Sequence, residues 1–308
     1  MILMELRHLR YFIAVAEEEH MTRAASRLFI QQPPLSQQIR ALEDHLGVVL
    51  FKRIGKRIEL NAAGKLFLAE SRQILQRVDA AVDKVRRFDQ GEEGLIRVGY
   101  TSSASMHELT PCIIREFRNA HPLVSLQIEE GAAHDLLCAV EENRLDLAFV
   151  RSSVEQYARL DCVSLIQEEM VVAIPIHHRL AKAPGMALEL TQLRDEPFIV
   201  YRQVNGSGIN EMVVKTCLLA GFEPRISHEV HRMMAAINLV AAGLGVSVVP
   251  QSLATLQPGS VVYRPLRHES PVSVPLNLAY RASLDIPATQ GFVQLSKALA
   301  GRTPSCAG

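Results

Sequence analysis

Residues 20–40 constrain the fold of this chain more than any other stretch, because two helical patterns meet there across a short break. The first pattern, from Thr22 to Phe29, is amphipathic. Pro33 follows the break, where the first turn of a helix tolerates proline because the amide that proline lacks would have no partner there. The apolar residues of the second pattern recur at helical spacing and are Leu35, Ile39 and Leu42. The segment predicts a helix, a turn and a second helix with one buried face.

The opposite face of the second helix carries long amide side chains, a hydroxyl and a guanidinium. Glutamine suits the edge of adenine, and arginine suits guanine or a phosphate, so this face fits the major groove of DNA. The residues of this face are Gln31, Gln32, Ser36, Gln37 and Arg40. An αα-hairpin buried in a core is the alternative that the two helical patterns leave open.

Charge is unevenly distributed along the chain. The 33 Lys and Arg residues balance the 33 Asp and Glu residues, so the net charge says nothing about nucleic acid. Residues 20–65, however, hold eight Lys or Arg against three acids. This local excess predicts contacts with phosphates, although a solvated basic face would have the same composition.

A two-stranded wing is expected directly after the second helix. Residues 48–53 and 57–60 alternate in polarity, with a turn at Gly55 between them. The cations of the wing that we expect to reach the DNA backbone or the minor groove are Arg53, Lys56 and Arg57. Asn61 is a favourable N-cap for the helix that follows.

That helix, residues 62–88, carries an apolar seam. Its positions are separated alternately by four and three residues and are Phe67, Ser71, Ile74, Val78, Ala81, Val85 and Phe88. Such a seam over about three heptads predicts pairing with a copy of the same helix, which lets two DNA-reading heads span two half-sites. The alternative is a helix that packs on its own chain. Residues 89–94 interrupt the pattern and predict a hinge.

From Leu95 onward, apolar strands alternate with short helices, which predicts βαβ units and parallel sheets. The expected strands are 96–100, 124–129, 147–150, 169–175, 198–201, 225–230, 246–250 and 276–281. The expected helices are 109–120, 134–142, 209–220, 233–242 and 288–300.

Cysteine usage and hydropathy indicate a reducing compartment. The five cysteines are widely spaced and form no C-x-x-C pair, so we expect free thiols that serve as small core residues. No stretch approaches the roughly 18 apolar residues of a membrane span, and residues 1–4 are too short for a signal peptide. We expect a cytoplasmic protein without a membrane partner.

Together these features resemble the LysR-type transcriptional regulators, whose N-terminal winged helix-turn-helix is similar to residues 4–51. The resemblance implies an α+β multidomain fold: a winged helix-turn-helix, a long linker helix and a two-lobed α/β effector domain like periplasmic binding proteins. The implied domains are residues 1–61, the dimerisation helix 62–88, the hinge 89–94 and the effector domain 95–308. Within the last, lobe I covers about 95–163 and 268–300, and lobe II about 164–267.

For DNA, the resemblance adds Pro33 and Pro34, which approach thymine methyl groups in this family. It also adds Thr22 and Arg23, at the start of the first helix of the motif, as phosphate contacts. The chain departs from the family at Gln31, where a serine usually caps the reading helix. The missing hydroxyl costs about 1 kcal/mol of helix-end stability unless Gln31 contacts a base instead.

The resemblance places a small-molecule effector between the lobes. The residues expected there are Thr101, Ser102, Ser103, Phe149, Arg151, Tyr201, Arg202 and Asn205. Hydroxyls and free amides at a helix start suit a carboxylate. Ordinary helix capping and surface salt bridges are the simpler interpretation of the same residues.

Residues 5–12, 32–36 and 239–245 are similar to the subgroup that responds to aromatic acids and muconate-type products. Ala132 departs from that subgroup, which tends to have a hydroxyl residue there for the ligand carboxylate. The implied partners are double-stranded promoter DNA, the effector, further copies in a homodimer or homotetramer, and RNA polymerase, which an activator contacts. No cofactor and no metal are expected.

Two other functions are possible for a chain of this kind. An enzyme is disfavoured because no Ser-His-Asp order, metal-ligand spacing or phosphate loop is present, and the glycines near Gly206 and Gly243 are too few for a dinucleotide fingerprint. A redox-responsive regulator of the same fold would need two cysteines in lobe II. Only Cys217 lies near the relevant strand-to-helix segment, so we expect DNA binding to be indifferent to peroxide.

Overall fold

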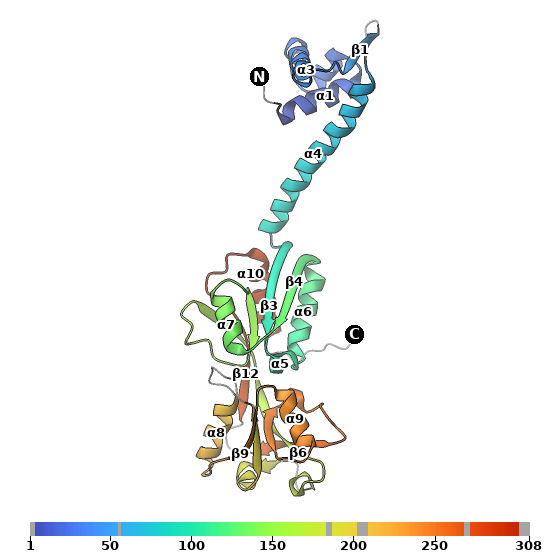
Figure 1. Ribbon diagram of the computed structural model, residues 1–308. Coiled ribbons are helices and arrows are strands. Elements are labelled where there is room, and N and C mark those ends of the chain that lie inside the picture. Colours follow the sequence, from blue (N-terminus) through green and yellow to red (C-terminus); the bar gives the residue numbers. More distant parts are fainter. Residues whose placement is uncertain (1–3, 55–56, 183–186, 202–208, 268–271, 302–308) are drawn as a thin grey trace. The chain divides into compact units, whose positions relative to one another are not determined.

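The structure is a computed structural model that describes residues 4–54, 57–182, 187–201, 209–267 and 272–301. The chain divides into two compact units, Met1–Arg86 and Arg87–Gly308. We call them the head unit and the effector unit and describe each by itself (Figure 1). None of the helices in the described ranges combines the length and the apolar character that crossing a membrane requires.

The head unit confirms the predicted winged helix-turn-helix. Its elements are α1 (Leu6–Glu18), α2 (Met21–Arg27), α3 (Gln32–Leu46), β1 (Phe51–Ile54), β2 (Arg57–Leu60) and the first part of α4 (Ala62–Asp89). Leu35, Ile39 and Leu42 of α3 are buried in one core with Phe12 of α1, as their helical spacing predicts. β1 and β2 pair antiparallel, with Phe51 opposite Leu60.

Local sequence explains where α4 begins. The Asn61 side chain accepts a hydrogen bond from the Gly64 amide at 2.8 Å, which is the expected N-cap. The same Asn61 donates to the carbonyl of Val49 at 2.6 Å and so fastens the helix to the segment before the wing. A β-carbon on Gly64 would lie 2.3 Å from the Leu50 carbonyl oxygen, so this close approach requires glycine.

The effector unit has two α/β lobes, as predicted. Lobe I contains β3 (Glu93–Tyr100), α5 (Ser102–Ser105), α6 (Leu109–Ala120), β4 (Leu123–Glu130), α7 (Ala133–Glu141), β5 (Leu147–Val150) and α10 (Pro287–Leu299). Lobe II contains η1 (Arg179–Lys182), β7 (Leu188–Glu189), η2 (Leu190–Leu193), β8 (Pro197–Tyr201), α8 (Ile209–Leu219), β9 (Arg225–Val230), α9 (Met233–Ala241), β10 (Ser247–Pro250), η3 (Gln251–Leu253) and β11 (Val261–Arg267).

Two long antiparallel strands, β6 (Leu160–Pro175) and β12 (Ser273–Arg281), join the lobes. The first part of β6 pairs with β12, and its last part, Met170–Pro175, pairs with β10 and β11. The sheet order is β4-β3-β5-β12-β6-β11-β7, and Figure 1 shows β12 where the lobes meet. The sequence predicts a strand only over residues 169–175. The structure corrects this to one continuous strand.

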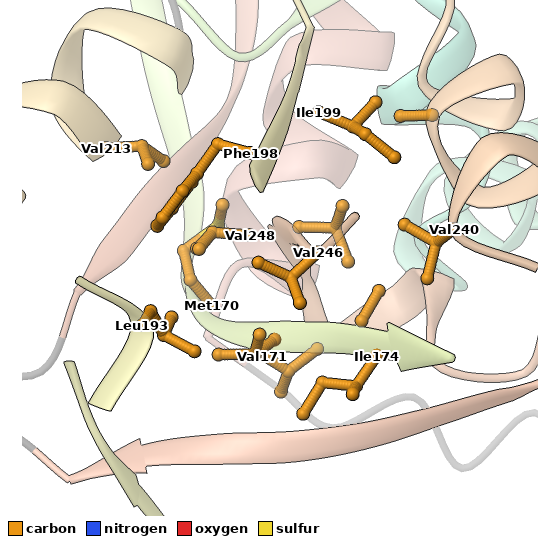
Figure 2. Close-up of a cluster of buried hydrophobic side chains, with 14 of the residues drawn as sticks. Met170, Val171, Ile174, Leu193, Phe198, Ile199, Val213, Val240, Val246 and Val248 are labelled. Atoms are coloured by element: carbon orange, nitrogen blue, oxygen red, sulfur yellow. The ribbon is translucent and has the colours of Figure 1, made fainter. Parts of the chain in front are cut away.

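The core of lobe II is rich in β-branched residues, many of them on strands that are covered on both faces. Figure 2 shows Val171 and Ile174 of β6 converging with Phe198 of β8, Val240 of α9 and Val246. Strands that are buried on both faces are expected to be continuous apolar runs rather than alternating ones. This explains the uninterrupted burial from Met170 to Ile174.

Candidate nucleic-acid interface and effector cavity

The exposed face of α3 carries the residues predicted to read DNA. Gln31, Gln32, Pro33, Pro34, Gln37 and Arg40 are all exposed, and Ser36 is half-buried. Gln32 Nε2 donates to Ser36 Oγ at 2.7 Å, which orients these two side chains one turn apart. Gln31 is the N-cap residue in an extended conformation, and its side chain accepts no capping bond, so the missing hydroxyl is not replaced.

The basic side chains of the head differ in whether they already form an ion pair with an acidic side chain. Arg23 donates to the carbonyl of Glu18, and its Nε lies 3.5 Å from the Glu18 carboxylate. Arg40, Arg53 and Arg57 form no ion pair within the described part of the head. These three guanidiniums are therefore available to phosphates without breaking a pair. Thr22 is exposed at the start of α2, and Lys56 lies outside the described residues.

The seam of α4 changes character along its length. Phe67 packs edge-on against Phe12, with ring centroids 4.9 Å apart, and Ser71 is fully buried. Phe67 is half-buried and packs against the head core, and its role in dimerisation stays a prediction. The seam residues exposed to solvent in the single chain are Ile74, Ala81, Val85 and Phe88, and Val78 is half-buried.

In the effector unit, a small cavity lies at the junction of the lobes. Lobe I contributes Thr101, Ser103, Ala133, Arg151 and Ser152 to its lining, and lobe II contributes Tyr201 and Ile209. Thr101 caps α5: its Oγ1 accepts from the Ala104 amide at 3.3 Å and lies 3.4 Å from Ser103 Oγ. The cavity is small, with room for about one water molecule.

Arg151 is the only cation that lines this cavity among the described residues, and it is almost completely buried. Its Nε donates to the Ser103 carbonyl at 3.2 Å, and its Nη2 donates to Glu168 Oε2 at 2.5 Å. Glu168 Oε1 in turn accepts from the Ser252 amide of η3, in lobe II. Burial lowers the pKa of Arg151, and the Glu168 carboxylate opposes that shift.

One donor of this guanidinium is left over. Arg151 Nη1 is buried and has no hydrogen-bond partner within the described part of the chain. A buried unpaired donor costs free energy, and most on a charged group. An anion in the cavity could accept from it, with the hydroxyls of Thr101 and Ser103 as further donors.

The other residues predicted to bind the effector do not line the cavity or lie outside the described residues, except Tyr201, which lines it. Phe149 was predicted to reach the cleft, but its ring is fully buried in the core of lobe I, 6.2 Å from the ring of Phe292. Ser102 is half-exposed and does not line the cavity. Arg202 and Asn205 lie outside the described residues. Ala132 is the N-cap residue of α7, and it has no side-chain cap.

Glu168, Ser152 and Ile209 were not predicted from the sequence. Glu168 had the clearest signal, because it lies two residues before the apolar run Met170–Ile174 of β6 and is itself buried. A buried carboxylate requires a partner, and the structure supplies Arg151. Within the described ranges, no three His, Cys, Asp or Glu side chains gather as metal ligands.

We expect hydrogen peroxide to leave DNA binding unchanged. Cys217 is fully buried, and burial raises the pKa of its thiol to about 11, so the reactive thiolate is scarce at neutral pH. Gel-shift titrations before and after peroxide should coincide for the native protein and for Cys217→Ser. A reversible peroxide response that disappears in Cys217→Ser would contradict this expectation.

Comparisons with known proteins cover both units. A family described as "Bacterial regulatory helix-turn-helix protein, lysR family" matches residues 6–65, and "LysR substrate binding domain" matches residues 89–301. The chain is 40% identical to "Uncharacterized HTH-type transcriptional regulator YnfL" of Escherichia coli (strain K12) over 87% of this chain and 90% of that protein. It is 37% identical to "HTH-type transcriptional regulator BudR" of Raoultella terrigena over 87% of this chain and 91% of that protein.

Among solved structures, "Crystal structure of full-length CbnR complexed with the target DNA complex" matches with a TM-score of 0.83 and 30% sequence identity. The match covers 96% of this chain and 99% of that one.

Proposed function

The chain belongs to the LysR family of transcriptional regulators, and on that premise we propose that a small carboxylate effector controls how α3 and the wing bind promoter DNA. It is a DNA-binding regulator with an effector-binding domain and not an enzyme. The observation that carries the proposed effector class is the buried, unpartnered Nη1 of Arg151 at the cavity between the lobes.

In this proposal, α3 enters the major groove. Gln32 and Ser36 act as one hydrogen-bonded unit toward base edges, and Arg40 reaches guanine or a phosphate. Arg53 and Arg57 of the wing have no acidic partner among the described residues and bind the backbone alongside. Paired α4 helices would hold two heads at two half-sites.

Footprinting tests the assignment of α3. Gln32→Ala and Arg40→Ala should each lower affinity for a selected duplex by roughly tenfold, since a good base contact contributes about 1–3 kcal/mol. Arg77→Ala, on an exposed position of α4, is the matched control and should bind as the native protein does. If both α3 variants bind the duplex with the native footprint and the native affinity, the assignment is overturned.

The proposed effector has a carboxylate and an apolar body, as aromatic acids and muconate-like acids do. Its carboxylate accepts from Arg151 Nη1, and Ala133 and Ile209 offer an apolar wall. Because the cavity has room for about one water molecule, the lobes must separate to admit such a ligand and then close on it. Closure would favour one arrangement of the paired heads over the other.

The remaining parts of the proposal follow from the same premise. A homodimer or homotetramer in the cytoplasm would activate transcription by contacting RNA polymerase. Substitution of Arg151 should change both stability and the response to the effector, and substitutions in the seam of α4 should lower DNA affinity.

A further inference from the structure

The turn from α2 to α3 holds a phenylalanine where the backbone favours glycine. The Phe29 amide donates to Ser26 O at 3.1 Å and the Ile30 amide to Ala25 O at 3.0 Å, which is the bonding of a Schellman motif. Phe29 occupies the left-handed position of this motif, with φ of 55°. Glycine is the usual residue there because it has no β-carbon to crowd the carbonyl.

The Phe29 ring contributes nothing to the core of the head. It is 96% exposed, whereas the next residue, Ile30, packs against the head core. Neither the backbone nor the packing of this unit therefore explains a large aromatic side chain at this position. An unfavourable backbone position that carries an exposed ring indicates a role outside the fold.

Phe29 forms one wall of a groove in the head unit with a volume of about 470 Å³. Arg7 and Tyr11 of α1 form another wall, and Gln31 and Pro34 of α3 form a third. The lining is mainly apolar and contains one cation and no acid. Arg7 pairs with Glu5 at 2.7 Å, but both side chains are about half exposed, so a phosphate can replace this weak partner.

We propose that this groove holds the sugar–phosphate backbone of one DNA strand, with the Phe29 ring against a deoxyribose and Arg7 at the adjacent phosphate. The inference rests on the proposed function of α3. Two observations favour DNA over a protein as the occupant. Gln31 and Pro34 belong both to the groove and to the DNA-reading face of α3, so the groove continues that face. Its single charge has the sign that attracts phosphate.

Phe29→Gly and Phe29→Asn in the full-length protein test the inference, with a duplex selected by this protein from a random pool as the probe. Both variants should bind this duplex roughly five- to tenfold more weakly, because an aromatic contact area is lost. Their melting temperature should be unchanged or higher, because glycine and asparagine suit the left-handed position. Their salt dependence should match the native protein, since a phenyl ring releases no counterion.

Arg7→Gln should behave differently. It removes one phosphate contact, so the slope of log affinity against log salt should decrease by about 0.9. Gln257→Gly is the matched control, because it also places glycine at a position with left-handed backbone, φ of 52°, but in the effector unit. This variant should bind DNA as the native protein does.

Native affinity in both Phe29 variants would overturn the inference. If such variants also lost activation with purified RNA polymerase, the groove would be a protein-docking surface instead. Arg40→Ala separates the two proposals. Weaker binding of DNA by Arg40→Ala together with native binding by Phe29→Gly rejects the groove alone. Native binding by both Arg40→Ala and Gln32→Ala rejects the role of α3.

Discussion

Replacing Arg151 by Met should destabilise the effector unit by about 3–5 kcal/mol, because it leaves the Glu168 carboxylate buried without its cation. Both side chains are nearly inaccessible to water, so solvent cannot compensate. Urea unfolding of the full-length protein, followed by a signal from the effector unit, measures the loss. A change below about 1 kcal/mol would show that Glu168 does not depend on this partner.

The double variant Arg151→Met with Glu168→Gln separates stability from ligand recognition. A glutamine oxygen can still accept from the Ser252 amide, and no buried charge is left over, so much of the stability should return. Benzoate and muconate should raise the melting temperature of the native protein by mass action but leave the double variant unchanged. A ligand response retained in the double variant would reject Arg151 as the carboxylate partner, and a flat native response would reject this effector class.

Two aspartates in the seam of α4 should separate the dimer and lower DNA affinity by roughly 100-fold or more, the avidity that linking two heads supplies. Val78→Asp with Val85→Asp places two charges in the seam one heptad apart, where a partner helix would bury them. Neither valine belongs to the core of the head, so the head should remain folded. Sedimentation measures the mass, and gel shift measures the affinity for the selected duplex.

Gln76→Asp is the matched control for the seam, because residue 76 lies on the opposite side of the heptad and is exposed. It should leave both the sedimentation and the affinity unchanged. A seam variant that stays dimeric and binds DNA normally would show that α4 does not pair through these positions.

Periodicity in the sequence predicted the elements with one strongly apolar face. Leu35, Ile39 and Leu42 place α3 in the head core, and the alternation after Leu95 predicts the two α/β lobes. The strand β11 escaped prediction because Arg264 and Pro265 interrupt it, and α5 because four residues carry no helical period. The first part of β6, before residue 169, also escaped prediction, although it belongs to the strand that both lobes share.

The candidate cavity was predictable only in part, because tertiary contacts decide which side chains reach it. Thr101 and Ser103 follow from a strand that leads into a helix. Phe149 does not reach the cavity, because all four residues of β5 are buried and the Phe149 ring fills the core of lobe I. The Arg151–Glu168 pair joins a residue that directly follows β5 to one on β6, 17 positions further on, and local pattern contains no information about such a pairing.

The strand shared by the lobes determines where they can rotate. The register of β6 and β12 shifts between Leu276 and Asn277, which pair with Ile166 and Ser164 and leave Leu165 as an extra residue. A bulge locally increases the twist of a strand and weakens its ladder. Leu165 is in the core of lobe I and Met170 in the core of lobe II, so β6 passes from one core to the other between these two residues. Glu168 lies on that short segment, so a ligand that binds Arg151 would act on the chain where it crosses between the lobes.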